Sequence, residues 1–150
     1  MKNNGLRKSA GTSETQHSLF NNNFVLITLC QRKVIALIDT GAQLTFASEK
    51  IFQLVPELHK YKLQKSKIGQ VLTADEGKLN VNGVIEVPAF IDDKYVRLNI
   101  HIVENLNREL ILGVDFLKRY QAVIDFSSRR MKLKGEWEIA VFGKVEGFSV

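Results

Sequence analysis

One aspartate stands where its charge is costly, directly after an apolar run. Asp39 follows the run VIALI at residues 34–38, and Thr40 and Gly41 come next. A carboxylate at the end of a buried strand costs free energy unless it is hydrogen-bonded or paired. Two interpretations fit this short stretch: Asp39 caps a turn, as aspartate often does, or it takes part in proton transfer.

The other polar side chains do not form a catalytic or metal-binding cluster in the sequence. The single cysteine, Cys30, excludes an intrachain disulfide and a multi-cysteine zinc site. The acidic pairs at 75–76 and 92–93 fit turns better than metal sites. The histidines are widely spread along the chain: His17, His59 and His101. We therefore expect no metal and no cofactor.

The composition is that of a globular protein with a basic surface. Of the 150 residues, 45% are hydrophobic and 25% are charged, and the formal net charge is +5. Basic residues are scattered apart from two short groups, 60–67 and 129–134, which lack zinc-knuckle spacing or a basic helix. These groups indicate solvated faces, so we expect no direct nucleic-acid partner. No segment approaches the length of a transmembrane span, so we expect no membrane partner.

Short apolar runs separated by turn residues predict an all-β, barrel-like domain with two brief helices. The first helix is expected at 48–54 with Ser48 as its cap, and the second at 114–120. A hairpin is expected at Gln31 and Arg32, between the first two strands. The expected strands are 24–29, 33–38, 63–73, 78–91, 95–103, 110–112, 122–126 and 131–134.

The chain divides into three parts by pattern, with one domain expected from its length. Residues 1–18 are polar without periodicity, which predicts a flexible N-terminal arm. Residues 19–135 contain the expected strands and helices and form the predicted domain. Residues 136–150 have strand-like apolar content, and we interpret them as a C-terminal extension or interface strand.

A second apolar run echoes the one that ends at Asp39. Residues 110–117 read LILGVDFL, and residues 37–42 read LIDTGA. Together, in this order, they resemble the retropepsin-like aspartic proteases of retroviruses and LTR retrotransposons. The resemblance covers about residues 22–134, and the version of the second motif is more similar to the retrotransposon branch.

The resemblance implies a fold and a mechanism. The fold is a single-lobe closed β-barrel with a flap hairpin, here about residues 71–81. Such proteases hydrolyse peptides with water held between two aspartates, and this chain carries one Asp-Thr-Gly. A homodimer would supply the second Asp39. Thr40 would hydrogen-bond across the pair, and Gly41 would allow a turn and a substrate approach that a Cβ would block.

The resemblance also implies a set of substrate-binding residues. Many retroviral members have an acidic residue where this chain has Gln43, and several have an arginine in place of Val114; both are absent together. Asp115 lies at the head of the second helix, where capping explains it without chemistry. The expected substrate-binding residues are Ala42, Gln43, Leu72, Thr73, Ala74 and Val114.

The predicted function is an aspartic endopeptidase that processes a Gag-Pol-type polyprotein in the cytoplasm or within virus-like particles. Its partners would be a second copy of the chain and an extended peptide or polyprotein. Two alternatives stay open. One is a domesticated or ubiquitin-shuttle-type retropepsin that acts on host proteins. The other is a non-catalytic dimeric module that binds peptides by strand addition.

Overall fold

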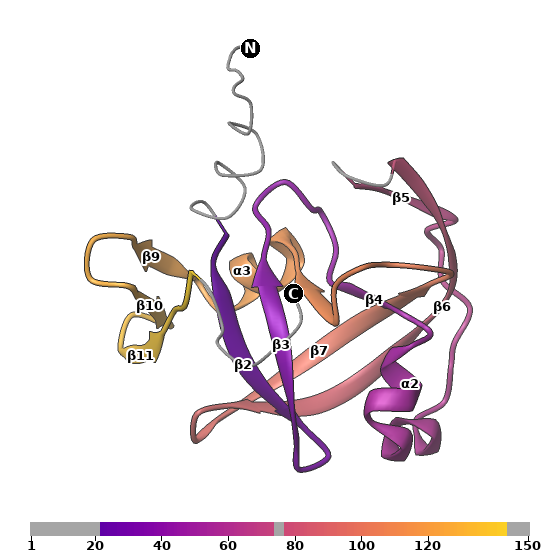
Figure 1. Ribbon diagram of the computed structural model, residues 1–150, viewed down its shortest axis with the longest axis horizontal. Coiled ribbons are helices and arrows are strands. Elements are labelled where there is room, and N and C mark those ends of the chain that lie inside the picture. Colours follow the sequence, from indigo (N-terminus) through magenta and orange to yellow (C-terminus); the bar gives the residue numbers. More distant parts are fainter. Residues whose placement is uncertain (1–21, 74–76, 144–150) are drawn as a thin grey trace.

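The computed structural model describes residues 22–73 and 77–143, and its all-β architecture confirms the predicted fold class (Figure 1). The predicted arm at 1–18, residue Ala74 and the end of the predicted C-terminal extension lie outside the described residues. The strands are β2 (Phe24–Leu29), β3 (Arg32–Ile38), β4 (Phe46–Ser48), β5 (Gln70–Thr73), β6 (Gly77–Ile91), β7 (Lys94–Val103), β8 (Leu110–Leu112), β9 (Val123–Asp125), β10 (Arg130–Leu133) and β11 (Trp137–Ala140). The helices are α2 (Ile51–Leu54), the 3₁₀-helix η1 (Pro56–Lys60) and α3 (Val114–Arg119).

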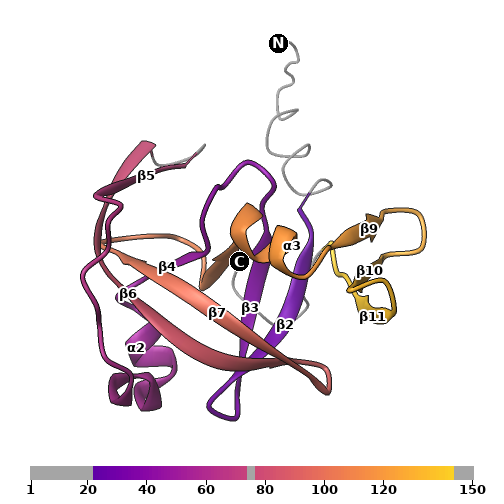
Figure 2. The same cartoon turned by 180° about the vertical axis from the view of Figure 1, so that it is seen from behind.

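Most strands belong to one sheet that closes on itself. Its order is β2-β3-β8-β4-β7-β6-β5, and a further pairing of β2 with β6, at Thr28 and Phe90, closes the barrel. β5 pairs only with β6 among the described strands, so these two strands form a hairpin that extends beyond the barrel. A separate three-stranded sheet, β11-β10-β9, lies beside the barrel near α3 (Figures 1 and 2).

Two hydrophobic clusters fill the molecule. The larger lies inside the barrel, where residues such as Ile27, Leu98 and Ile100 are fully buried. The smaller lies where the β5–β6 hairpin faces the segment after β3. Its members are Ala42, Phe46, Val71, Leu79, Val103, Leu106 and Ile111, with Leu37, Leu44 and Val81 partly buried against them.

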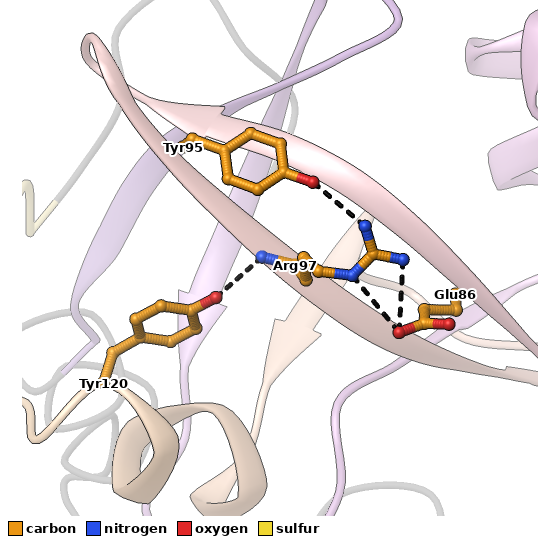
Figure 3. A network of polar contacts seen from close by, with 4 residues as sticks. All are labelled: Glu86, Tyr95, Arg97 and Tyr120. Atoms are coloured by element: carbon orange, nitrogen blue, oxygen red, sulfur yellow. Dashed lines mark hydrogen bonds and ion pairs between the residues drawn. The ribbon is translucent and has the colours of Figure 1, made fainter.

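A polar network joins α3 to the outer wall of the barrel (Figure 3). The backbone N–H of Arg97, on β7, donates to the hydroxyl of Tyr120 over 2.7 Å. The guanidinium of Arg97 contacts Glu86 of β6 and Tyr95 of β7. These bonds fix the end of α3, and with it the helix that comes after the second motif.

The expected helix at 48–54 begins later than predicted. Ser48 belongs to β4, where it pairs with Val103 of β7, and α2 begins at Ile51 without a side-chain cap. The Ser48 hydroxyl instead accepts the backbone N–H of Lys50 over 3.2 Å. Strand pairing therefore outweighs the capping preference at this position.

The expected strand at 63–73 is also shorter than predicted. Only residues 70–73 form a strand, and the preceding segment makes one isolated bridge, between Gln64 and Val84. Neither β4 nor η1 was predicted from the sequence. Within the described ranges, no helix is long and apolar enough to cross a membrane.

Candidate active site

Asp39 comes directly after the last residue of β3, and the backbone on both sides of it is paired. β3 and β8 run parallel with Ile38 opposite Leu112, so the two apolar runs of the sequence end side by side. The N–H of Asp39 donates to the carbonyl of Leu112 over 3.0 Å, and the N–H of Ile38 donates to the carbonyl of Asn23 over 2.8 Å. The carboxylate is thereby carried at the end of a rigid strand.

Within the described residues, the Asp39 carboxylate has one hydrogen bond, to the turn after it. Its Oδ1 accepts the N–H of Gly41 over 2.9 Å, and the N–H of Ala42 donates to the Asp39 carbonyl over 3.1 Å. Asp39 is half-buried, whereas Thr40 and Gly41 are exposed. The geometry leaves most of the carboxylate's hydrogen-bonding capacity available to water or another group.

The space beside Asp39, and not a left-handed backbone, favours glycine at position 41. Gly41 does not adopt a positive φ, contrary to the expectation that its turn is closed to residues with a Cβ. A Cβ at this position would instead lie 3.3 Å from Oδ1 of Asp39. A side chain there would crowd the carboxylate and any group approaching it.

The second motif supports the loop that carries Asp39. The first N–H groups of α3, those of Val114 and Asp115, donate to the carbonyls of Ala42 (2.8 Å) and Gln43 (3.1 Å). A Cβ on Gly113 would lie 2.8 Å from the Ala42 carbonyl and even closer to that of Leu44. Only glycine therefore allows the two loops to pack this closely.

Asp115 binds, at Thr45, the loop that carries Asp39. The cap position of α3 is Gly113, and no side chain caps it. Oδ1 of Asp115 accepts the hydroxyl of Thr45 over 2.8 Å and Oδ2 accepts its N–H over 3.1 Å, while Phe116 donates a third bond of 2.7 Å. Gly113, and not Asp115, is therefore the cap residue of α3; Asp115 lies in the first turn, where it accepts the N–H of Phe116, and its other two bonds come from Thr45.

Thr45 is a positioning residue that was not predicted from the sequence. It is buried, with 1% of its surface exposed, and its hydroxyl also accepts the N–H of Gly113 over 3.2 Å. On the opposite side, its carbonyl contacts the buried His101 through the backbone N–H (3.0 Å) and Nδ1 (3.1 Å). The one feature of the sequence that could have indicated this role is that a hydroxyl residue lies at the end of the loop after Asp39.

The β5–β6 hairpin presents one face to the site loop and one to solvent. Val71 and Leu79 are opposite each other in the ladder, and both are buried in the cluster that contains Ala42. Leu72, which was expected to bind substrate, is 70% exposed on the other face of β5. Val71 and Leu79 are thus the hairpin residues that face the site.

The remaining expected substrate-binding residues lie in different surroundings. Gln43 is exposed, Val114 is half-buried beside it at the head of α3, and Thr73 is half-buried in the hairpin. Ala42 is buried beneath the hairpin. A cavity of about 640 Å³ opens elsewhere, beside α2 and η1, and Asp39 does not line it. Among the described residues, no three His, Cys, Asp or Glu side chains are grouped to hold a metal ion.

Comparison with known sequences places this geometry in a family. The family model described as "Aspartyl protease" matches residues 17–125. The chain therefore belongs to the aspartyl protease family. It is 30% identical over 114 residues to "DNA damage-inducible protein 1" of Neurospora crassa, covering 76% of this chain and 25% of that protein. It is 28% identical over 124 residues to "UBA domain-containing protein Mud1" of Schizosaccharomyces pombe, covering 82% of this chain and 36% of the relative.

Solved structures confirm the retropepsin-like form of the fold. The retroviral protease-like domain of Ddi1 from Leishmania major matches with a TM-score of 0.65 and 20% identity, covering 81% of this chain and 94% of that one. EIAV protease, in complex with the inhibitor HBY-793, matches with a TM-score of 0.51 and 15% identity, covering 68% and 90%. The predicted resemblance to retropepsin-like aspartic proteases is confirmed.

Proposed function

We propose that the protein is an aspartic endopeptidase whose active site forms between two copies of the chain. The observation that carries this proposal is the contrast between one accessible Asp-Thr-Gly per chain and a neighbouring carboxylate, Asp115, that is already satisfied by Thr45. Peptide hydrolysis of this kind needs two carboxylates on one water. A two-fold dimer supplies the second Asp39.

In this mechanism the two carboxylates share one proton, since two like charges about 3 Å apart cannot both ionise. The ionised carboxylate takes a proton from water as the water oxygen attacks the scissile carbonyl carbon. The protonated carboxyl donates its proton to the carbonyl oxygen, and a tetrahedral intermediate results. The carboxyl that took the proton from water then donates it to the amide nitrogen, the other carboxylate takes a proton from a hydroxyl of the intermediate, and the C–N bond breaks. Thr40 would link the two loops, and Gly41 would leave room for substrate backbone.

The proposed substrate is an extended polypeptide lying between the Asp39 loop and the β5–β6 hairpin, which we name the flap. The buried face of the flap carries Val71 and Leu79, directed at the cluster that contains Ala42. Closure of the flap would exclude water and add main-chain hydrogen bonds to an extended chain. Ala42, Gln43 and Val114 remain proposed substrate contacts.

Two sources of substrate remain in competition. Processing of a Gag-Pol-type polyprotein stays a prediction. A host-protein substrate, as in ubiquitin-shuttle retropepsins, is favoured by the similarity to proteins named for DNA damage induction and for a UBA domain. The chain spans only 25% and 36% of the lengths of those two relatives, so their other domains lie outside the matched region.

A mixing experiment tests the shared site. Wild-type chain is mixed with a threefold excess of Asp39→Asn chain under conditions that allow exchange, and peptide cleavage is measured. With random pairing, about one dimer in sixteen contains two intact chains. Activity per wild-type chain should therefore drop to about a quarter. Activity that instead tracks the amount of wild-type chain, undiminished, would show that one chain supplies both carboxylates.

The control for the mixing experiment is the same excess of a Glu86→Gln chain. Glu86 is exposed on β6, where its carboxylate contacts the guanidinium of Arg97 (Figure 3). Every dimer in this mixture holds two intact Asp39 residues, so cleavage should follow the total concentration of chain and reach about four times the activity of the wild-type chain alone. A wild-type dimer that binds extended peptides without cleaving them would instead support the non-catalytic alternative.

A further inference from the structure

The flap joins the barrel at an irregularity in β6. Along most of its length β6 pairs with β7 in regular register, but the register shifts between Val81 and Gly83. Asn82 is the extra residue. Beyond it, residues 77–80 pair with β5 to form the flap. Such bulges often occur next to active sites, where they bend a strand and change the direction of its next residues.

The side chain of Asn82 is bonded to the segment that comes after the catalytic loop. Its Nδ2 donates to Oε2 of Glu49 over 2.6 Å, across 33 residues of sequence. Because a carboxylate only accepts, this contact fixes the orientation of the Asn82 amide. Glu49 directly follows β4, and β4 begins one residue after Thr45. The bond therefore links the root of the flap to the far end of β4, the strand that follows the loop carrying Asp39.

On its other side, the part of β6 where the flap joins the barrel packs against the segment that contains Leu63 and Gln64. A Cβ on Gly83 would lie 2.6 Å from Cγ of Leu63 and 2.8 Å from the carbonyl of Gln64. Next to it, Val84 and Gln64 exchange two backbone hydrogen bonds of 2.9 Å each. The strand is thus held up to Gly83. Past the bulge at Asn82 it pairs with β7 once more at Val81, whose N–H donates to the carbonyl of Gly69 over 2.9 Å.

A second carboxylate contacts the flap more weakly. Oε1 of Glu104, which comes directly after β7, lies 3.5 Å from the N–H of Asn80, at the limit of a hydrogen bond. The Asn80 side chain accepts from Gln70 within the flap itself, over 3.1 Å. Of these side-chain contacts, only the short Glu49–Asn82 bond joins the barrel side to the bulge.

We propose that Glu49 and Asn82 form a latch that sets how the flap stands over Asp39. Both are positioning residues: they act through the flap and touch neither substrate nor reacting atoms. This role in catalysis rests on the proposed endopeptidase function, whereas the latch itself is a property of the fold. Figures 1 and 2 show the flap and the loop between β3 and β4 on the same side of the barrel, as this role requires.

Hydrogen exchange of backbone amides tests the latch without any need for catalysis. In the full chain, Asn82→Ala or Glu49→Ala should speed exchange of the flap amides at 70–73 and 77–81 by about three- to tenfold, as expected on losing one hydrogen bond to a charged group. Amides at 96–100 in β7 serve as the internal reference and should not change. Equal exchange rates in the flap of wild-type and Asn82→Ala protein would overturn the proposal.

Matched variants separate the latch from a general loss of stability. The double variant should exchange no faster than either single variant, because both remove the same bond. Glu49→Gln retains an acceptor oxygen and should recover most of the wild-type protection. Glu86→Ala removes another exposed carboxylate partner on β6 and should leave the flap unchanged. Additive single effects, or equal loosening by Glu86→Ala, would contradict a specific latch.

Peptide cleavage then tests the effect of the latch on substrate. A looser flap binds substrate more weakly, so Asn82→Ala should raise KM by about three- to tenfold while kcat changes less than about twofold. Wild-type protein that cannot cleave would defeat the proposed function, yet the exchange result would still stand. Wild-type protein that cleaves, with faster flap exchange but unchanged KM in Asn82→Ala, would show that the bond positions nothing relevant to substrate.

Discussion

Asp39 directly follows β3, Asp115 lies in the first turn of α3 just beyond β8, and the two carboxylates differ in their hydrogen bonds. Each lies just after one strand of the parallel pair β3–β8, and both are half-buried. Within the described residues, Asp39 accepts one hydrogen bond, from Gly41, whereas Asp115 accepts three, from Thr45 and Phe116. Two half-buried carboxylates therefore differ in the number of donors already bound to them, and this leaves Asp39 more hydrogen-bonding capacity for another group than Asp115.

The comparison predicts its largest effect at Asp39. Asp39→Asn is nearly isosteric and removes the charge that the proposed dyad shares, so peptide cleavage should fall by several orders of magnitude. The melting temperature should stay within a few degrees of wild type, because this carboxylate accepts a single hydrogen bond from the described part of the chain. Cleavage assays and thermal unfolding of the purified variant measure the two effects. Undiminished cleavage would remove Asp39 from the mechanism.

The next effect concerns the contact between the two loops. Gly113→Ala should destabilise the fold by about 3 kcal/mol, because its Cβ would meet the backbone carbonyls of Leu44 and Ala42, which cannot move aside cheaply. Denaturant unfolding gives the change in free energy. Gly69→Ala is the control, since no atom lies within 4 Å of a Cβ built there. Equal stability of both variants would show that the loops are not closely packed.

A smaller effect is expected where Asp115 holds its partner. Thr45→Val keeps the shape and removes the hydroxyl, so Asp115 loses one donor and the N–H of Gly113 loses its acceptor. Leaving buried polar groups unsatisfied should cost about 1–3 kcal/mol. Cleavage should weaken as the loop loosens. Thr45→Ser keeps the hydroxyl and should recover most of the stability in denaturant unfolding. A fully stable Thr45→Val variant would refute the anchoring role.

The same two carboxylates show what the sequence could and could not predict. The local run before Asp39 left turn capping open, and Asp39 became the candidate only together with the second motif at residues 110–117, through the resemblance that the two motifs carry. The bonds from Thr45 to Asp115 were not predicted because Thr45 lies 70 residues away, and the pairing of β8 with β3 and β4 brings the two together. The local pattern placed Asp115 correctly in the first turn of the second helix but gave no sign of this distant partner.

The flap shows a second limit of prediction from sequence: the pattern locates the hairpin but does not tell which of its residues face the site. The pattern predicted a hairpin near residues 71–81, and the structure has one. Which residues face the site depends on the pleat, because successive side chains point to opposite faces. Val71 points to the buried cluster and Leu72 to solvent. β8 is as short as β4 but was predicted because LIL is a continuous apolar run, whereas β4 reads FAS and its Ser48 was assigned to a helix cap.

The smallest change in stability is expected at a third carboxylate, Asp125. It has as many hydrogen-bond donors as Asp115 but is more exposed, so it tests the effect of donor number independently of burial. Like Asp115 it accepts three hydrogen bonds, from the hydroxyl and N–H of Ser127 and the N–H of Ser128, but it is exposed, at the end of β9. The bonds from Ser127, and then those from Ser128, lower the pKa of Asp125 below its ordinary value. A lowered pKa stabilises the fold above the unfolded-state pKa, and the contribution is lost as the pH falls through the folded-state pKa.

Asp125→Asn should therefore lower the melting temperature slightly at about pH 7, and the difference from wild type should vanish in acid, below the ordinary aspartate range. Water competes for exposed hydrogen bonds, so the change should be smaller than that of Thr45→Val. Thermal unfolding across this pH range measures both variants together. A loss at Asp125 as large as that at Thr45 would show that three donors matter equally on the surface and in the interior. In that case burial would not contribute to the stability that the hydrogen bonds of Asp115 provide. The difference between Asp115 and Asp39 would then come from the number of donors alone.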